Sequence, residues 1–292
     1  MSGVTRVQLD SAQLQRLYEL AGIPVPPTGA GETATTGQHW TERLDACTDE
    51  APQPSVVDDA LAELGLMVDG QLSSGAAEAM SVWHGAAEAV EVEVLARQGG
   101  RMTRVTSRQR LGGDTVVAAS SADGCTTEWA VLPAQRWWME LTRAALVPAQ
   151  QSVPAEVAAL PDVIEVGWEC LLAAGWSVEV GQPHLIDELA RDGAESVLGG
   201  PSAAALDVVG ALVAARWLFL LASASVGRLH ARRVLRRGED VAYGDVEWVL
   251  LPDGWRCVEP AVRDGWRAVR LTRCRPTDLA GHLALLTPAG AR

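Results

Sequence analysis

Apolar residues recur at helical spacing in the first part of the chain. Between residues 7 and 21, one helical stripe carries Val7, Leu14, Leu17, Tyr18 and Ala21, which predicts an amphipathic helix that stops at Gly22. The segment 24–56 is rich in Gly, Thr and Pro and predicts a loop. Two further helices are predicted over about 56–66 and 75–88. The N-terminal part of the chain is therefore expected to be helical, with one long interruption.

The next part alternates between apolar and polar positions, which is typical of half-buried strands. Gly-containing turns separate these strands at Gln98–Gly100, Leu111–Asp114 and Asp123–Gly124. The predicted elements are strands over 91–95, 102–110, 116–120 and 126–132, and then a helix over 134–146.

The second part of the chain repeats this succession of helices, strands and a closing helix. A helix over 155–174 is predicted to turn Val157, Leu160, Ile164, Trp168 and Leu171 to one face. Helices near 184–192 and 202–213 lead into an apolar segment at 217–223. The remaining predicted elements are strands over 228–237, 246–251, 255–259 and 266–272, and a helix over 277–286. Segregated helices and antiparallel strands predict the α+β class.

Short sequence echoes suggest an internal duplication. Glu128–Pro133 resembles Glu247–Pro252 at an offset of 119, and Arg110–Asp114 resembles Arg236–Asp240 at an offset of 126. Leu146–Ala149 and Leu286–Ala289 match at an offset of 140. We therefore expect a pseudo-twofold fold whose related halves, about 57–148 and 185–288, each hold an antiparallel sheet flanked by helices. The alternative is chance likeness between Arg-rich strands.

Composition removes several classes of enzyme and of partner. All 24 basic residues are Arg, so the chain has neither a Walker A lysine nor a Schiff-base lysine. No Asn is present, which excludes the kinase catalytic-loop metal ligand. A net charge of −13 repels nucleic acids and anionic membranes, so neither is an expected partner. The basic run 228–237 is interpreted as the solvated face of a strand, with a polyanion site as the alternative.

Reactive side chains form no motif of catalysis or metal binding. The five Cys residues show no C-x-x-C spacing, so free buried thiols are expected, with no disulfide, metal or cofactor. Two carboxylate pairs, Glu91 with Glu93 and Glu165 with Glu169, have spacings that suit acid–base chemistry or a solvated face. The 11 Trp residues supply the core or a ligand platform. Nothing in these patterns identifies an enzyme.

The order of several segments resembles a known family. A helical stretch Asp58–Leu66 precedes the helix Ala76–Val82 and the strand Glu91–Val94. The tail Val269–Leu286 gives a strand and then a helix, and the opening stretch Leu14–Ile23 precedes a run of prolines. In this order the chain resembles the EspG family, the type VII secretion-associated chaperones of actinobacteria.

The resemblance implies one EspG-like domain over 1–292 and a cytoplasmic chaperone that is not an enzyme. Its implied partners are helical secretion substrates such as PE–PPE heterodimers, which the family covers at an exposed apolar tip. A loop between central strands and the C-terminal helix would form the contact surface, with Leu111 as an apolar residue that no strand neighbour hides. The implied partner-binding residues are Gln98, Gly99, Gly100, Arg101, Leu111, Gly112, Gly113, Asp114, Leu279, Leu283 and Leu286.

Two other hypotheses remain open at this stage. An enzyme or small-ligand-binding protein on an uncharacterised α+β scaffold would show one deep cavity with converging polar groups. A nucleic-acid-binding regulator would use the basic run 228–237 and bind in a salt-dependent way. A chaperone would instead present a broad, shallow apolar patch.

Overall fold

The computed structural model describes seven parts of the chain, which form two compact units. Unit 1 combines Met1–Glu91, Val105–Glu140 and Arg233–Tyr243, and unit 2 combines Val92–Arg104, Leu141–Arg232 and Gly244–Arg292. The described residues are 4–24, 53–147, 153–192, 197–199, 208–238, 240–263 and 266–285. Most of the predicted loop 24–56 lies outside them.

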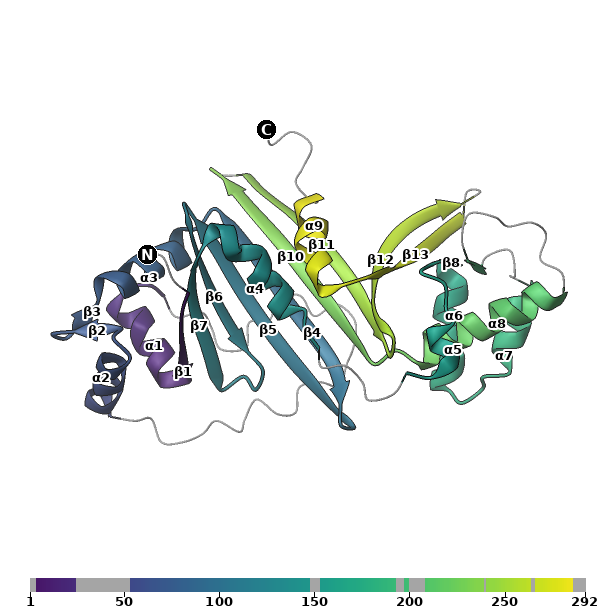
Figure 1. Ribbon diagram of the computed structural model, residues 1–292, viewed down its shortest axis with the longest axis horizontal. Coiled ribbons are helices and arrows are strands. Elements are labelled where there is room, and N and C mark those ends of the chain that lie inside the picture. Colours follow the sequence, from purple (N-terminus) through teal and green to yellow (C-terminus); the bar gives the residue numbers. More distant parts are fainter. Residues whose placement is uncertain are drawn as a thin grey trace. The chain divides into compact units, whose positions relative to one another are not determined.

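Long antiparallel strands dominate the described residues (Figure 1). Their hydrogen-bonded order in the larger sheet is β1-β7-β6-β5-β4-β10-β11-β12-β13-β8-β9. The strands of this sheet are β1 (Thr5–Asp10), β4 (Glu88–Gln98), β5 (Arg101–Gly112), β6 (Thr115–Ser121), β7 (Thr126–Pro133), β8 (Val163–Gly167), β9 (Val197–Gly199), β10 (Gly227–Arg237), β11 (Asp240–Leu251), β12 (Gly254–Arg263) and β13 (Trp266–Cys274). A separate small hairpin pairs β2 (Met67–Val68) with β3 (Gln71–Leu72).

Helices precede and follow the runs of strands, which confirms the predicted α+β class. They are α1 (Ser11–Leu20), α2 (Pro54–Glu63), α3 (Ser74–Gly85), α4 (Trp137–Ala144), α5 (Ala155–Ala158), α6 (Trp168–Glu179), α7 (Leu185–Asp192), α8 (Val208–Ser223) and α9 (Leu279–Leu285). Short 3-10 turns, η1 (Ala134–Arg136) and η3 (Pro276–Asp278), lead into α4 and α9.

The strand order recurs at an offset that two of the three sequence echoes, those at 119 and 126, do not share. Two four-strand meanders, β4-β5-β6-β7 and β10-β11-β12-β13, are each followed by a 3-10 turn and a helix. β4 starts at Glu88 and β10 at Gly227, 139 positions later. The echo at offset 119 instead joins β7 to β11, which stand at different places in the two meanders, so that alignment was wrong. A twofold relation between the halves 57–148 and 185–288 stays a prediction.

Unit 1 packs helices on both faces of its strands (Figure 1). α1, α2 and α3 contribute Leu17, Leu61 and Met80 to a core that also holds Val117 of β6 and Trp129 of β7. The neighbouring strand residues point the other way, because side chains alternate along a strand. They form a second cluster, built around Val116, Ala118, Ala130 and Leu132, which Trp137 of α4 covers.

The N-terminal segment differs from its prediction by one strand. Residues 5–10 form β1, paired antiparallel with β7, and the helix begins only at Ser11. Asp10 caps that helix, because its carboxylate accepts a hydrogen bond from the Gln13 amide while the Gln13 side chain bonds the Asp10 amide. The helix ends as predicted before Gly22, whose φ of 66° suits glycine.

Unit 2 encloses its core between α6, α8 and the strands β8 and β13. Ile164, Ala174, Leu218 and Leu271 are buried there. The helix predicted over 155–174 is in fact a short helix α5, the strand β8 and the helix α6. Period-two burial of Ile164 and Val166 in β8 overrides the helical pattern, since β8 pairs with β13.

Candidate partner-binding surfaces

The first predicted contact site, Gln98–Arg101, is the tip of the β4–β5 hairpin in unit 2. Gly99 and Gly100 form the turn with φ values of 54° and 82°. Both values lie in the left-handed region, which a two-residue hairpin turn of this type requires at its two central positions. Gly99, Gly100 and Arg101 are exposed. The tip is therefore an ordered turn that carries one exposed cation.

The second predicted site, Leu111–Asp114, is the β5–β6 turn in unit 1. Leu111 pairs with Val116 and packs against the cluster of β6 and β7 residues under α4. The expectation that no neighbour hides Leu111 was therefore wrong. A Cβ atom on Gly112 would lie 3.2 Å from a methyl group of Val82, so this glycine serves close packing. Gly112 and Leu111 therefore have a structural role in the packing of unit 1.

The third predicted site, the C-terminal helix α9, turns its predicted contact residues inward. Leu279 and Leu283 are buried, and Leu286 lies outside the described residues. α9 is fixed to β11 by a hydrogen bond from Trp248 Nε1 to His282 Nδ1 of 3.2 Å. The apolar side chain that α9 presents to solvent is Leu285, which is 84% exposed. The first tip and α9 belong to unit 2 and the second turn to unit 1, so a single continuous partner surface stays a prediction.

The basic run 228–237 forms ion pairs along β10. Arg232 Nε lies 2.7 Å from Asp245 Oδ1, and Arg233 donates to Glu88 at 2.6–2.8 Å. Arg228 lies 4.0 Å from Glu93. Because these guanidinium groups face carboxylates of their own chain, the geometry favours the interpretation as a strand face over a polyanion site.

The two carboxylate pairs considered for acid–base chemistry also face arginines. Glu93 accepts a hydrogen bond from Arg104 at 2.7 Å, and Arg110 lies 3.7 Å from Glu91. The second pair, Glu165 and Glu169, bonds Arg270 and Arg267, each at 2.7 Å. For Glu169, hydrogen bonding to its own backbone amide and to Arg267 lowers the pKa of the carboxyl. Each carboxylate therefore sits in a surface ion pair.

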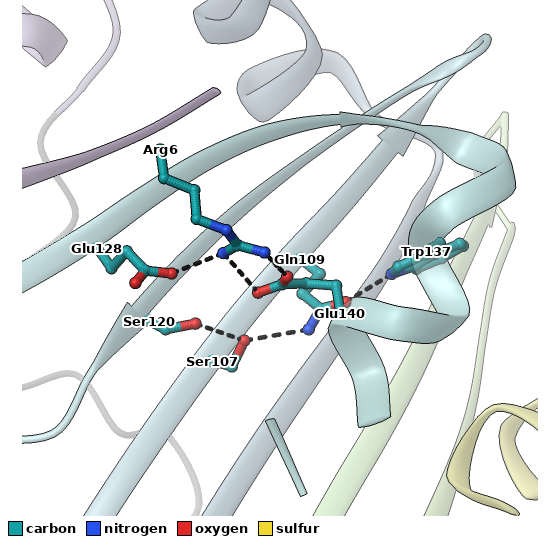
Figure 2. Close-up of polar contacts among 7 residues, drawn as sticks. All are labelled: Arg6, Ser107, Gln109, Ser120, Glu128, Trp137 and Glu140. Carbon is teal, nitrogen blue, oxygen red and sulfur yellow. Dashed lines mark hydrogen bonds and ion pairs between the residues drawn. The ribbon is translucent and has the colours of Figure 1, made fainter. Parts of the chain in front are cut away.

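A partly buried polar network fastens α4 to the sheet of unit 1 (Figure 2). Arg6 of β1 bonds the Glu140 carboxylate at 2.5 Å and the Glu128 carboxylate at 2.7 Å. The bond to Glu140 is the main reason that the pKa of Arg6 is raised. Beside it, Gln109 accepts a bond from Trp137 Nε1 at 2.6 Å and donates to Ser107 at 3.1 Å. Such mutually satisfied groups hold a helix in register on a sheet.

One cysteine departs from the sequence-based expectation. Cys125 is disulfide-bonded, so the prediction that all five thiols are free was wrong. Cys170, Cys257 and Cys274 are free, and burial raises the pKa of Cys257 to about 11 and that of Cys274 to about 12. Within the described residues, no group of three or more His, Cys, Asp and Glu side chains could hold a metal ion.

Each unit has an open groove among its described residues. The groove of unit 2, of about 290 Å³, lies between α5 and α8, and its lining includes Arg216 and Glu156, which form an ion pair at 3.6 Å. The other, of about 680 Å³ in unit 1, runs between the end of α1, the β2–β3 hairpin and α3. Its lining is largely apolar, with His84 as its titratable residue. Neither has several polar groups converging on one point, as the ligand-binding hypothesis expects.

An exposed row of apolar side chains on α6 was missed from the sequence. Trp168, Leu172 and Trp176 are 41%, 55% and 58% exposed, and Val180 continues the row beyond the helix. The prediction placed Trp168 on the inward face of a longer helix. The sequence 168–178 could have indicated this exposed row, because Glu169 and Ser177 are its only polar residues. A helix with a single buried face would carry more polar residues on its solvent side.

The fold of this chain resembles that of a solved chaperone structure. No protein-family model and no curated protein matches the sequence. The structure resembles that of the Mycobacterium tuberculosis type VII secretion system chaperone EspG5, solved in complex with the PE25–PPE41 dimer. The TM-score is 0.58, the identity is 12%, and the match covers 99% of each chain. The resemblance to EspG chaperones drawn from the sequence is thus confirmed at the level of the fold.

A second solved structure carries no argument. The N-terminal dehydratase of the difficidin assembly line aligns with a TM-score of only 0.09 at 9% identity, so nothing is inferred from it. None of the helices in the described residues is both long enough and apolar enough to cross a membrane.

Proposed function

We propose that this protein is a cytoplasmic chaperone or adaptor for helical type VII secretion substrates of the PE–PPE kind, and that it is not an enzyme. One observation carries the proposal: the fold matches over 99% of the chain a chaperone that was solved with such a dimer bound. Shallow apolar grooves and exposed apolar side chains are consistent with it, since partner sites are often exposed apolar patches.

We propose that the predicted elements contact the partner, but through side chains other than the predicted ones. At the hairpin tip, Arg101 is exposed and can bond the polar ends of a substrate helix. At α9, Leu285 replaces the buried Leu279 and Leu283 as the apolar contact. The β5–β6 turn of unit 1 is a separate candidate contact, through its exposed Gly113 and Asp114.

Co-expression with a PE–PPE-like pair from the same genome tests the function. We expect the pair to co-purify in a 1:1:1 complex, measured by affinity pull-down and light scattering. Failure of every such pair to bind would refute the proposal.

Two substitutions then test the surface within a complex that forms. Arg101→Glu and Leu285→Asp should each weaken binding by about 2 kcal/mol, or roughly 30-fold, if each is a hot spot. Val262→Asp is the matched control, because Val262 is 78% exposed on β12. If both test variants bind as tightly as the control, the substrate contacts other parts of the protein.

A further inference from the structure

The exposed row on α6 is an ordered feature of unit 2. Trp168, Leu172 and Trp176 follow one another every four residues, so their side chains lie in one row along the helix. With Val180 the row extends about 18 Å, at about 1.5 Å per residue. Exposed apolar residues scattered singly are ordinary, whereas a continuous row with two tryptophans marks an interaction site.

The opposite face of α6 is already occupied. Ala174 is buried in the core of unit 2, and Leu171 and Val178 pack against that core. The Ser177 hydroxyl donates to the Ala173 carbonyl oxygen at 2.8 Å, so this buried polar group is satisfied within the helix. α6 is therefore anchored by one apolar face and leaves a second apolar face at the surface.

The charged side chains of α6 are all acidic. α6 contains Glu169 and Glu179 and no basic residue. Glu169 is matched by Arg267 of β13 at 2.7 Å, whereas Glu179 makes no ion pair with any described residue. Glu179 also stands in the last turn, where the unpaired carbonyl groups of the helix add negative potential. α7, which packs against α6, adds the exposed carboxylates Asp187 and Glu188.

We infer that the α6 row is a docking site for an amphipathic helix whose apolar stripe is flanked by basic residues. The apolar stripe of that helix would cover the row formed by the two tryptophans and Leu172, as ridges of one helix pack into grooves of another. A basic side chain of that helix would lie against Glu179 at the C-terminal end of α6. This site differs from the hairpin tip and α9 surface, and it does not depend on the proposed function.

A second copy of the chain fits this row poorly. In an antiparallel pairing of two α6 helices, Glu169 of one copy would approach Glu179 of the other. In a parallel pairing, the two Glu179 carboxylates would approach each other. Like charges that are brought together at an interface weaken it, and each chain carries a net charge of −13. Charge complementarity therefore selects a basic partner.

Synthetic helical peptides test the inference on the full-length protein. The probe is a fluorescein-labelled peptide of about 18 residues with Leu at i, i+4, i+7 and i+11 and Lys on both flanks. One control peptide replaces Lys by Glu, and another has the same composition in scrambled order. Binding is measured by fluorescence anisotropy at low and high salt. The protein variants are Leu172→Asp, Trp176→Asp and Glu179→Gln, with Val262→Asp as the exposed control.

We expect the Lys-flanked peptide to bind at least tenfold more tightly than either control peptide. Leu172→Asp and Trp176→Asp should each weaken it at least tenfold, Glu179→Gln about threefold at low salt only, and Val262→Asp less than twofold. Both Asp variants should melt at the wild-type temperature, because the replaced side chains are half exposed or more. Equal binding of the Lys- and Glu-flanked peptides, or no effect of Leu172→Asp, would overturn the inference. So would α6-dependent dimerisation seen by light scattering.

Discussion

A hydrogen bond between two buried aromatic residues gives the clearest test of the packing in unit 1. Trp83 Nε1 of α3 donates to the hydroxyl oxygen of Tyr18 on α1 at 2.7 Å, and both side chains are buried. The Trp83 ring also lies 4.9 Å from that of Trp129, between ring centroids. The bond therefore links two helices at the point where both meet the sheet.

Tyr18→Phe removes the acceptor and leaves the indole N–H of Trp83 buried without a partner. Such a loss costs about 1–3 kcal/mol, and the space left by one hydroxyl is too small for a bridging water. We expect a loss of about 2 kcal/mol in the free energy of unfolding. At a urea m-value of about 3 kcal/mol/M, the midpoint falls by about 0.7 M. Urea titration followed by circular dichroism measures it.

The chain supplies its own control, because its other tyrosine is exposed. Tyr243 is 71% exposed, and Tyr243→Phe should change stability by no more than about 0.5 kcal/mol. A Tyr18→Phe effect equal to that of Tyr243→Phe would refute the argument. So would full additivity with Trp83→Phe, since two partners in one bond should show a coupling of about 1 kcal/mol.

The same tyrosine predicts a pH dependence. Burial raises the pKa of Tyr18 above 10.0, so the unfolded state releases this proton at a lower pH than the folded state. The stability contributed by the neutral phenol is thus present below about pH 10 and is lost as the pH rises further. Tyr18→Phe should remove this part of the alkaline loss, measured by urea midpoints between pH 9 and 11.

Other predictions concern the thiols and two glycines. Cys257 and Cys274 should resist a thiol reagent at pH 8 until the protein unfolds, because burial raises their pKa values to about 11 and 12. The stability that the two neutral, buried thiols contribute should fall as the pH rises from about 9 through these folded-state pKa values. Cys125 should be alkylated only after reduction, as judged by mass spectrometry, because it is disulfide-bonded. Gly227→Ala should destabilise by about 3 kcal/mol, because its Cβ atom would lie 2.4 Å from a carbonyl oxygen of β4. Gly281→Ala, in open space within α9, should instead stabilise by about 0.5–1 kcal/mol, and thermal melts compare the two.

The first strand meander was predictable because its turns are marked by residues with few conformational choices. The Gln98–Gly100 and Asp123–Gly124 turns lie where they were expected, since Gly99, Gly100 and Gly124 all take positive φ. Strand β1 was not predictable in the same way. Its residues 5–10 also fit a helical period, and their pairing with β7 is set by a segment more than a hundred residues away.

The sequence echoes at offsets 119 and 126 do not join equivalent strands or turns of the two meanders. Glu-Trp followed by an apolar run suits any strand whose Trp is buried, and both Trp129 in β7 and Trp248 in β11 are buried. The two segments therefore resemble each other because both strands bury a Trp, and not because they hold equivalent positions in the two meanders. The recurring strand order is visible only through hydrogen-bonded pairing, where β4 and β10 start their meanders 139 residues apart, at Glu88 and Gly227.

The candidate surfaces were the least predictable part, because apolar character does not say which side of an element is covered. Leu283 was expected at the partner-binding surface and Trp168 on the inward face of a helix, yet Leu283 is buried and Trp168 is 41% exposed. In α9 a single apolar face packs inward. In α6 apolar residues surround the helix, while the core of unit 2 can cover only one side. A helix that is apolar on all sides but covered on one side leaves an apolar face exposed to solvent. The exposure of its side chains in the structure identifies this face, whereas no sequence motif does. The exposed Leu172 at the centre of that face, more than the buried leucines of α9, is therefore where a substitution separates binding from folding.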